Sequence, residues 1–418
     1  MKILIATDYF PPDKWGGAES IAHMHATGLI EAGHEVNIIS TTQDINSTGL
    51  IKHNNIKIFK IYSNYHIRWR AWKSLNNKQV VTEFEKKLKE TKPEIIHFHS
   101  INHHLSYKCL QIAKNYGAKV YFTAHDVMTF SYGKLWHEKF VHSDELEIRN
   151  QFDYKVTWLD NLKKAKKRYN PWRNSRIKKY LKYADKIITV SNALKEALKQ
   201  NGIENTQTIH NGINITHWDK PIDINTIKQQ FSITNKKVVL FAGRLNGAKG
   251  KDQILKTWKE VNKEVKDAVL LIVGTNHPDL KKTAPQQPFN KTQNNNKNII
   301  FHPPVLREDL YKYYKISNVV IVPSASFDSF PTINLEAFAC HKPVIATQYG
   351  GSREIVENNK SGYIVSPFDI KSMTKKIIKL LKNSTTAKQF GETGYNRVKK
   401  EFTLKNHINS LLKVYQEK

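Results

Sequence analysis

The stretch NVVIVPSASFDSFPTINLEAFACHKPVIATQYGG, residues 318–351, contains a short apolar run, a polar turn, a helical segment and a second apolar run. Residues 318–322 have the β-branched composition of a buried parallel strand, and residues 342–346 form a second short strand. Pro331 and Thr332 open the segment between them, because proline fits the first turn of a helix. This order of strand, loop, helix and strand predicts a βαβ unit and therefore an α/β fold.

The loop and the helix start of this unit form a predicted ligand site. Open parallel sheets bind ligands at the carboxyl ends of their strands, and a helix N-terminus attracts phosphate. Two carboxylates flank that position, Asp328 in the loop and Glu336 in the helix. One isolated glutamate on a helix is ordinarily a solvated charge, so the whole run, and not Glu336 alone, predicts a site.

The spacing of these residues resembles the signature of a large family of retaining glycosyltransferases, family four, which includes sucrose synthases and bacterial polysaccharide transferases. In that signature an acidic residue is followed, after seven positions, by glutamate and then by Ala-x-Ala-x-Gly-x-Pro-Val. Asp328 and Glu336 occupy the acidic positions, and AFACHKPV, residues 337–344, follows. The sequence departs from the signature in two places, since the first acid is usually glutamate and His341 stands where glycine is usual.

The resemblance implies an α/β fold of the GT-B type, with two Rossmann-like domains facing a central cleft. It implies an acceptor-binding domain over residues 1–205, a linker over residues 206–235, and a nucleotide-sugar-binding domain over residues 236–403. A C-terminal helix, residues 404–418, is expected to pack back on the first domain. The length of 418 residues suits two domains of ordinary size.

A second motif, RLNGAKG, occupies residues 244–250 and follows a predicted strand at residues 237–243. It is not a P-loop, which needs four residues between its first glycine and the Gly-Lys pair. It resembles the Gly-Arg-Leu…Lys-Gly element of the family, whose arginine and lysine grip the donor diphosphate. Arg244 and Lys249 take these positions, and their planar and point charges suit phosphate oxygens. A solvated arginine and lysine is the alternative.

Carried over position by position, the resemblance implies roles for individual side chains. Asp328 would hold a hydroxyl of the donor sugar, Glu336 would hold the ribose hydroxyls, and the backbone of Val305 would contact the base. The implied catalytic residues are His125, Asp328, Arg244 and Lys249. The implied donor-binding residues are Gly16, Gly17, Arg244, Lys249, Val305, Asp328, Pro331, Thr332, Ile333, Asn334 and Glu336.

The N-terminal part carries two weaker landmarks. Gly16-Gly17 lies in a turn-rich loop between a strand predicted at residues 2–7 and a helix predicted at residues 18–32. The loop lacks Gly-x-Gly-x-x-Gly, so NAD binding is weakly supported, and the glycines either admit a substrate or form a tight turn. His125-Asp126 follows a strand predicted at residues 119–123 and resembles the family's His-Asp, whose histidine lies beside the donor sugar. A helix N-cap aspartate with a neighbouring histidine is the alternative.

Four histidines lie close together in the sequence, at His97, His99, His103 and His104. No cysteine or carboxylate at metal-ligand spacing joins them, so core and loop histidines are predicted rather than a metal site. The chain also contains no Asp-x-Asp. We therefore expect no metal and no cofactor, with cations taking the place of a metal beside the diphosphate.

The balance of 66 Lys and Arg against 37 Asp and Glu gives a formal charge of +29 and predicts an anionic partner. Residues 163–182 carry ten basic and no acidic residues, with Tyr169, Trp172 and Tyr180 among them, and residues 68–73 repeat this chemistry. A solvated helix face is the ordinary interpretation of such a run. The density of charge with aromatic residues favours an anionic membrane surface. Nucleic acid is not expected as a partner, because nucleic-acid binding would not explain the two motifs.

The sequence predicts a cytosolic protein, peripheral on the inner face of the membrane. Cys109 and Cys340 imply no disulfide framework, and the apolar start turns polar at Asp8, too early for a signal peptide. No run approaches the roughly 20 apolar residues of a membrane span.

The resemblance implies a retaining glycosyltransferase that moves a sugar from a nucleotide-diphosphate sugar to a glycan or lipid-linked acceptor, in cell-surface polysaccharide biosynthesis. Two alternatives stay open, a sugar-nucleotide epimerase of the same fold and an inactive nucleotide-sugar-binding module.

Overall fold

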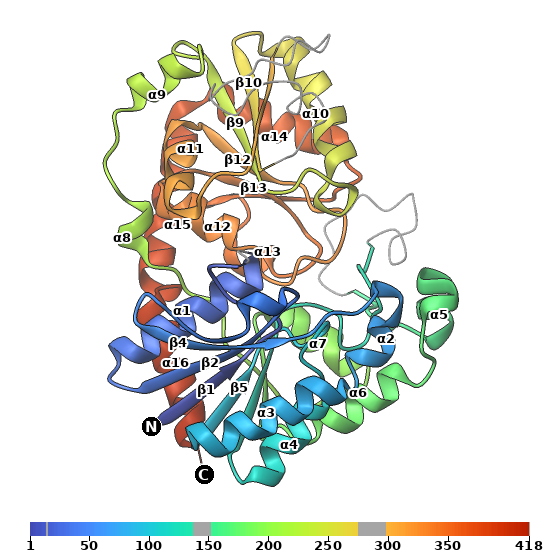
Figure 1. Cartoon of the computed structure of the whole chain (residues 1–418). Coiled ribbons are helices and arrows are strands. Elements are labelled where there is room, and N and C mark those ends of the chain that lie inside the picture. The colour runs from blue at the N-terminus through green and yellow to red at the C-terminus, as the bar shows by residue number, and fades with distance from the viewer. Residues whose placement is uncertain (14–15, 137–151, 275–297, 418) are drawn as a thin grey trace. The chain divides into compact units, whose positions relative to one another are not determined.

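The computed structural model describes residues 1–13, 16–136, 152–274 and 298–417. The described residues divide into two compact units, each built on its own sheet (Figure 1). Unit 1 contains the described residues of Met1–Leu135, Asp153–Gly212 and Leu404–Lys418. Unit 2 contains those of Trp136–Phe152 and Ile213–Thr403.

The sheet of unit 1 has the strand order β3-β4-β2-β1-β5-β6-β7-β8 in the described part of the chain. Its strands are β1 Lys2–Ala6, β2 Glu35–Thr42, β3 Gly49–His53, β4 Ile56–Tyr62, β5 Ile95–Phe98, β6 Lys119–Ala124, β7 Lys186–Thr189 and β8 Thr206–Thr208. All neighbours pair in parallel except β3, which runs antiparallel to β4 with Ile51 opposite Ile58. The central strands are apolar and buried along nearly their whole length, as parallel strands covered on both faces must be.

Helices cover this sheet. They are α1 Gly17–Glu31, α2 Arg70–Lys73, α3 Lys78–Thr91, α4 Lys108–Tyr116, α5 Trp158–Ala165, α6 Arg173–Leu181, α7 Asn192–Gln200 and α16 Leu404–Gln416, with single 3-10 turns at η1 Ile45–Ser47, η2 Ile67–Trp69 and η4 Lys166–Arg168. The C-terminal helix α16 belongs to the same core as β1 and α1, through Ile408, Leu411 and Val414. The last residues of the chain therefore complete the core of the unit that contains its first residues.

The sheet of unit 2 is parallel throughout, with the order β11-β10-β9-β12-β13-β14 in the described residues. Its strands are β9 Lys237–Ala242, β10 Ala268–Val273, β11 Ile299–His302, β12 Val319–Val322, β13 Val344–Thr347 and β14 Gly362–Val365. Its helices are α8 Ile215–Trp218, α9 Ile224–Gln230, α10 Lys251–Glu264, α11 Leu310–Ile316, α12 Thr332–Ala339, α13 Ser352–Ile355, α14 Ile370–Lys382 and α15 Ser384–Glu401, with 3-10 turns at η5 Gly247–Lys249 and η7 Arg307–Asp309. The core is centred on Trp258, which is fully buried among the strands and α14.

Each sheet has a point at which the strand order reverses. In unit 1, β1 lies between β2 and β5, and in unit 2, β9 lies between β10 and β12. Loops that leave neighbouring strands diverge at such a point, and α/β folds bind ligands there. The loops after β1 and β5 in unit 1, and after β9 and β12 in unit 2, are therefore the places to look for sites.

The segment predicted as a linker, residues 206–235, contains β8, α8 and α9 and is therefore partly regular. Asp223 caps α9 by accepting hydrogen bonds from the backbone of Asn225 and Thr226, and Trp218 is buried. The cap thus holds α9 and the buried ring holds α8, and an apolar pattern reveals neither. A segment rich in Gln, Asn and Lys at residues 278–297, expected from its composition to lie at the surface, is outside the described residues.

The basic run at residues 163–182 is less uniformly exposed than its composition indicates. Tyr169 and Arg173 are buried, whereas Trp172 is 63% exposed. Arg173 donates a hydrogen bond to the carbonyl oxygen of Met128 and lies over the ring of Tyr132. Among the described residues, no helix is both long enough and apolar enough to cross a membrane.

Candidate functional site

Lys249 and Asp328 meet at the point of reversal in unit 2. Lys249 is in the turn η5 after β9, and Asp328 is in the loop after β12. The Nζ atom of Lys249 lies 2.6 Å from Oδ2 of Asp328, and the hydroxyl of Ser324 donates to the same oxygen at 3.0 Å. The Lys249 side chain is 34% exposed and that of Asp328 is 15% exposed, so the lysine is the more accessible of the two. The pair places a cation and a carboxylate side by side at the edge where ligands bind.

The two loops are fixed to each other by their backbones. The carbonyl oxygen of Ala248 accepts hydrogen bonds from the N–H groups of Ala325 and Ser326, at 3.1 and 3.2 Å. Gly250 has φ +83°, and a Cβ atom there would lie 1.8 Å from the carbonyl oxygen of Pro323. Only glycine permits this approach, because any other residue would be both strained and in collision. The Lys-Gly sequence therefore sets the position of Lys249 against Asp328.

Glu336 belongs to a separate, buried network. Its Oε1 accepts from Arg307 at 2.9 Å and from the Thr332 hydroxyl at 3.1 Å, and its Oε2 accepts from the Tyr314 hydroxyl at 2.8 Å. Burial, and then the charge of Glu336, raise the pKa of Tyr314 well above its ordinary value. Glu336 is thus not a solvated helix charge. Arg307 was missed by the sequence analysis, and its only signal is a basic residue soon after the strand β11.

The helix α12 starts beside these groups. Pro331 is its N-cap and no side chain caps it, so its first N–H groups are left to other partners. Ile333 approaches Gly243, which ties this helix start to the loop after β9. The side chain of Asn334 is fully buried, and its Nδ2 donates to the hydroxyl of Ser352 at 3.1 Å.

Arg244 and Val305 stand apart from the Lys249–Asp328 pair. Arg244 is exposed directly after Gly243, and no hydrogen bond or ion pair joins it to another residue that the structure describes. Val305 lies in a shallow groove with Phe231 and Tyr313. The structure therefore joins Lys249 and Asp328 directly, and no ion pair or hydrogen bond among the described residues adds Arg244 to them.

In unit 1, Gly16 and Gly17 lie at the N-terminus of α1. Gly16 is the N-cap with an extended backbone, and neither residue has a positive φ. A Cβ atom at Gly17 would meet nothing within 4 Å, and one at Gly16 would meet only the flexible side chain of Glu19. The backbone therefore does not require glycine at either position, which weakens the tight-turn alternative.

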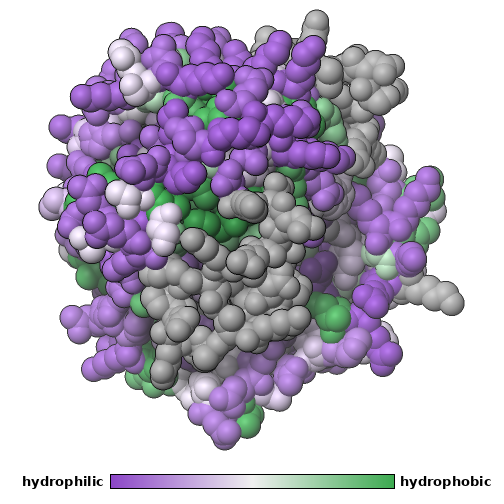
Figure 2. All heavy atoms as spheres, turned by 90° about the horizontal axis from the view of Figure 1, so that it is seen from above, coloured by the Kyte–Doolittle hydropathy of each residue, from purple (hydrophilic) through white to green (hydrophobic). Residues whose placement is uncertain are grey.

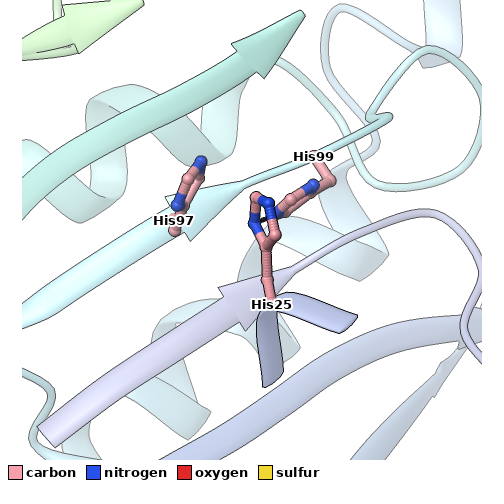
Figure 3. A group of neighbouring side chains, drawn as sticks. All are labelled: His25, His97 and His99. Carbon is pink, nitrogen blue, oxygen red and sulfur yellow. Dashed lines mark hydrogen bonds between the residues drawn. The ribbon is translucent and has the colours of Figure 1, made fainter. Parts of the chain in front are cut away.

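His125 follows β6 and contacts a cluster of buried histidines. Its Nε2 lies 2.8 Å from Nδ1 of His99, and burial lowers its pKa to about 3. His25, His97 and His99 bring ring nitrogens within 4.8 Å of one another (Figure 3). His97 and His99, which lie near His103 and His104 in the sequence, are joined in the fold by His25 from α1. His104 contacts Gln43 and Ser63 instead.

Asp8 is a second residue that the sequence analysis did not select. It lies two residues after the end of β1. Its carboxylate accepts hydrogen bonds from the backbone N–H groups of His103, His104 and Leu105 at 2.6–2.8 Å. Burial raises its pKa to about 7, against the three N–H donors, which lower it. Asp8 thereby orders the loop after β5 at the point of reversal in unit 1.

The fold has many counterparts among solved structures. Sucrose-phosphate synthase from Thermosynechococcus elongatus matches with a TM-score of 0.75 and 18% identity, over 99% of this chain and 98% of that one. The Anabaena protein HepE, solved with UDP-glucose, matches with a TM-score of 0.68 and 17% identity, over 99% of both chains. The two parallel-sheet units thus define a protein of the GT-B class, and the predicted fold class is confirmed.

Two family models then identify the chain. One described as Glycosyltransferase Family 4 matches residues 15–217, and one described as Glycosyl transferases group 1 matches residues 223–397. The two models cover successive parts of one glycosyltransferase family, family 4 with its group 1 domain, and the protein belongs to this family.

Curated relatives agree with this assignment. An uncharacterized glycosyltransferase of Methanocaldococcus jannaschii, MJ1607, is 24% identical over 380 residues, which are 88% of this chain and 85% of that protein. The capsular polysaccharide biosynthesis glycosyltransferase CapM of Staphylococcus aureus is 26% identical over 229 residues, 53% of this chain and 58% of CapM. The chain spans less than two thirds of the length of several such relatives.

Proposed function

We propose that the protein is a retaining glycosyltransferase that moves a sugar from a nucleotide-diphosphate sugar to a hydroxyl group of a glycan or lipid-linked acceptor. The Lys249–Asp328 pair carries this proposal, because it sets a cation for a leaving diphosphate 2.6 Å from a carboxylate for a sugar hydroxyl. The complex of HepE with UDP-glucose supports the class of donor. The kinship with CapM supports a role in cell-surface polysaccharide biosynthesis.

The charges of unit 2 suit the reaction. Breaking the bond between the anomeric carbon and the phosphate oxygen leaves negative charge on the diphosphate and positive character on the carbon. Lys249, Arg244 and the uncapped start of α12 would stabilise the diphosphate. The diphosphate would compete with Asp328 for Lys249, and Asp328 would accept a hydrogen bond from a hydroxyl of the donor sugar. The acceptor would attack on the face from which the phosphate leaves, and that phosphate would take its proton.

Glu336 would hold the ribose hydroxyls of the donor. Arg307 and the hydroxyl of Tyr314 keep its carboxylate in place with bonds of 2.9 and 2.8 Å. The third partner, Thr332, is partly exposed at the start of α12, so a ribose hydroxyl would compete with Thr332 for Oε1. Glu336 thus becomes a pre-oriented acceptor whose orientation depends on Arg307 and Tyr314.

A panel of UDP-, GDP- and ADP-sugars tests the donor class. We expect mass spectrometry of the intact protein to show binding of one base class, and proton NMR to show that the transferred sugar keeps its anomeric configuration. Interconversion of free sugar nucleotides without an acceptor would instead indicate the epimerase. Binding without turnover of any acceptor would indicate the inactive module, and failure to bind any nucleotide sugar would refute both donor and function.

We propose further that no metal takes part in the reaction. The chain has no Asp-x-Asp, and Lys249 and Arg244 would supply the positive charge that a metal otherwise provides. Transfer should therefore proceed at the same rate after EDTA treatment. Loss of activity with EDTA that Mg²⁺ or Mn²⁺ restores would contradict the proposal.

We place the enzyme on an anionic membrane surface through unit 1. Arg70 and Arg173 both lie over the ring of Tyr132, with their guanidinium carbons 4.4 and 5.4 Å from its centroid. The two basic segments at residues 68–73 and 163–182 thus both contact Tyr132. If the acceptor is lipid-linked, binding to the membrane would bring the enzyme to its acceptor.

A further inference from the structure

Four histidines of unit 1 form one hydrogen-bonded chain. Nε2 of His125 lies 2.8 Å from Nδ1 of His99, whose Nε2 lies 3.2 Å from Nδ1 of His25. Nε2 of His25 contacts Nε2 of His407, and Nδ1 of His407 lies 2.7 Å from the carbonyl oxygen of His210. The rings come from the ends of two strands, from α1 and from α16. We call these four residues the histidine chain.

The contact with His210 at one end of the histidine chain determines which ring donates and which accepts in each of its hydrogen bonds. A backbone carbonyl only accepts hydrogen bonds, so Nδ1 of His407 carries a proton. A neutral imidazole has one N–H, so Nε2 of His407 accepts from the Nε2–H of His25. Nδ1 of His25 then accepts from the Nε2–H of His99, and Nδ1 of His99 accepts from the Nε2–H of His125. One carbonyl group thereby assigns the tautomer of all four rings.

The surroundings keep the histidine chain neutral. Burial lowers the pKa of His125 to about 3 and that of His407 to about 4, and it lowers the pKa values of His25 and His99 well below their usual range. The titratable neighbours include the ring of His97, stacked on His99 at 4.6 Å, Tyr415, which contacts His97, and His210, whose ring acts on His407. Within the described residues, no carboxylate forms an ion pair with a ring of the chain.

The outer end of the histidine chain is Nδ1 of His125. His125 is partly exposed after β6, and no residue in the described part of the chain forms a hydrogen bond with that nitrogen. Because Nε2 carries the proton, Nδ1 has a lone pair and acts as an acceptor. A hydroxyl group, which can donate, is the complementary ligand group.

We propose that His99, His25 and His407 are positioning residues that hold His125 in its Nε2–H tautomer, so that Nδ1 accepts a hydrogen bond from a sugar hydroxyl group. The identity of the hydroxyl rests on the proposed function, whereas the tautomer does not.

A metal ion at His25, His97 and His99 is the competing use of these rings (Figure 3). Both nitrogens of His97 already have hydroxyl partners, Tyr415 at Nδ1 and Thr123 at Nε2. Both nitrogens of His25 and of His99 face other histidines. A metal would have to break these contacts, so the hydrogen-bonded chain is the better account.

Long-range ¹⁵N–¹H NMR of the ¹⁵N-histidine-labelled full chain tests the tautomers, with resonances assigned by single variants. The wild type should show His125 protonated at Nε2. His407→Phe removes the acceptor of His25, so the remaining three rings should reverse and place the proton of His125 on Nδ1. His407→Gln is the matched control, because its amide can accept from His25 and donate to the carbonyl of His210, and it should keep the wild-type tautomers.

Kinetics supply an independent readout. In His407→Phe, kcat should fall about tenfold, the loss of one hydrogen bond, with KM for the donor little changed, and His407→Gln should restore it. If His407→Phe does not fold, His25→Leu is the second variant. It interrupts the histidine chain one ring closer to His125, and it should reverse the tautomers of His99 and His125.

Three results would overturn the inference: Nδ1–H at His125 in the wild type, an unchanged His125 tautomer in both severed variants, or added Zn²⁺ binding at these nitrogens. Reversal of the tautomer in a protein without transferase activity would refute the proposed function and leave the positioning role standing.

Discussion

At the scale of single residues, the two candidate carboxylates of unit 2 differ in what they contribute. Glu336 is almost fully buried and held by three donors, so its removal would affect folding as well as binding. Asp328 and Lys249 are partly exposed, and such pairs add little to stability. Lys249 is therefore the residue at which an effect on activity can be separated from an effect on the fold.

Lys249→Ala should lower kcat by about 10² or more while the protein stays folded, because a charge that stabilises the leaving diphosphate is lost. Lys251→Ala is the matched control, since Lys251 is an exposed lysine two positions away. Transfer kinetics measure the loss, and circular dichroism checks the fold. Near-normal transfer by Lys249→Ala would remove Lys249 from the site.

Acid should weaken unit 1 through its buried histidines. Below the unfolded histidine pKa of about 6.5, the unfolded chain binds a proton at His407 that the folded chain does not bind until about pH 4. His407 therefore contributes a fall of about 3 kcal/mol in the free energy of unfolding as the pH drops through this window, and Asp8, whose pKa is raised to about 7 in the folded chain, contributes in the opposite direction. Hydrogen exchange of the amides of β1 and β5 at pH 7 and pH 4.5 measures the fall.

His407→Gln should reduce this pH dependence, because one titrating group is removed. The exposed His66 provides the control, and His66→Gln should leave the dependence as in the wild type. Equal pH dependence in His407→Gln and the wild type would show that the buried ring is not held neutral.

The residues that the sequence could not predict share a physical reason. Lys249, Asp328 and Glu336 lie in motifs, where spacing along the chain reports position in the site. His25 and His407 touch across 382 positions, and Arg307 reaches Glu336 from another element. Such contacts depend on how helices pack on the sheet, and nothing in the local sequence of either partner encodes the other.

At the scale of elements, buried parallel strands were predicted best, because burial on both faces produces uninterrupted apolar runs. The strands predicted at residues 237–243 and 318–322 agree with β9 and β12 to within one residue at each end. The half-exposed edge strand β3 and the polar helix α9 were not predicted. They contain too few apolar residues to show the periodic spacing that predicts a strand or a helix. Pairing with β4 holds β3 in place, and its N-cap holds α9.

The turn η5 is the element on which the site depends most. Gly250→Ala should displace this turn from the loop after β12, since the new Cβ would meet the carbonyl oxygen of Pro323 at 1.8 Å. We expect a stability loss of about 1–3 kcal/mol and a weaker affinity for the donor. Thermal unfolding and donor titration measure the two effects.

Gly33→Ala is the control for Gly250→Ala. Gly33 has a similar φ of +84°, but a Cβ atom there would meet nothing within 4 Å. It carries the backbone strain without the collision, and it lies in unit 1 after α1. If both variants lose the same stability and neither loses donor affinity, the close approach at Pro323 does not position Lys249.

At the scale of the whole molecule, net charge alone does not locate a partner. Where its residues are coloured, Figure 2 shows a largely hydrophilic face, as expected from a formal charge of +29. What singles out unit 1 is exposed tryptophan among the basic residues. Trp69, Trp72 and Trp172 are 49%, 46% and 63% exposed. Exposed indole rings beside lysine and arginine are typical of an interface with lipid headgroups.

Liposome co-sedimentation tests the membrane placement of unit 1. Each basic side chain near an anionic leaflet contributes about 1 kcal/mol, so binding should require anionic lipid and fade at high salt. The variant for this test replaces five exposed charges by Gln, at Lys163, Lys166, Arg168, Arg176 and Lys179. It should lose most binding, and Trp172→Ala should weaken binding even at low salt, because its indole adds apolar contact.

The matched control removes the same charge from unit 2, again by Gln, at the exposed Lys256, Lys371, Lys375, Lys388 and Lys399. If the surface of unit 1 binds the membrane, this control keeps its affinity although its net charge falls equally. Equal losses in the two variants would show that total charge, and not this surface, attracts the lipid. Binding that ignores lipid charge altogether would refute the placement. Because exposed tryptophans lie in the basic segments of unit 1, a local surface predicts a difference between the two variants, whereas total charge does not.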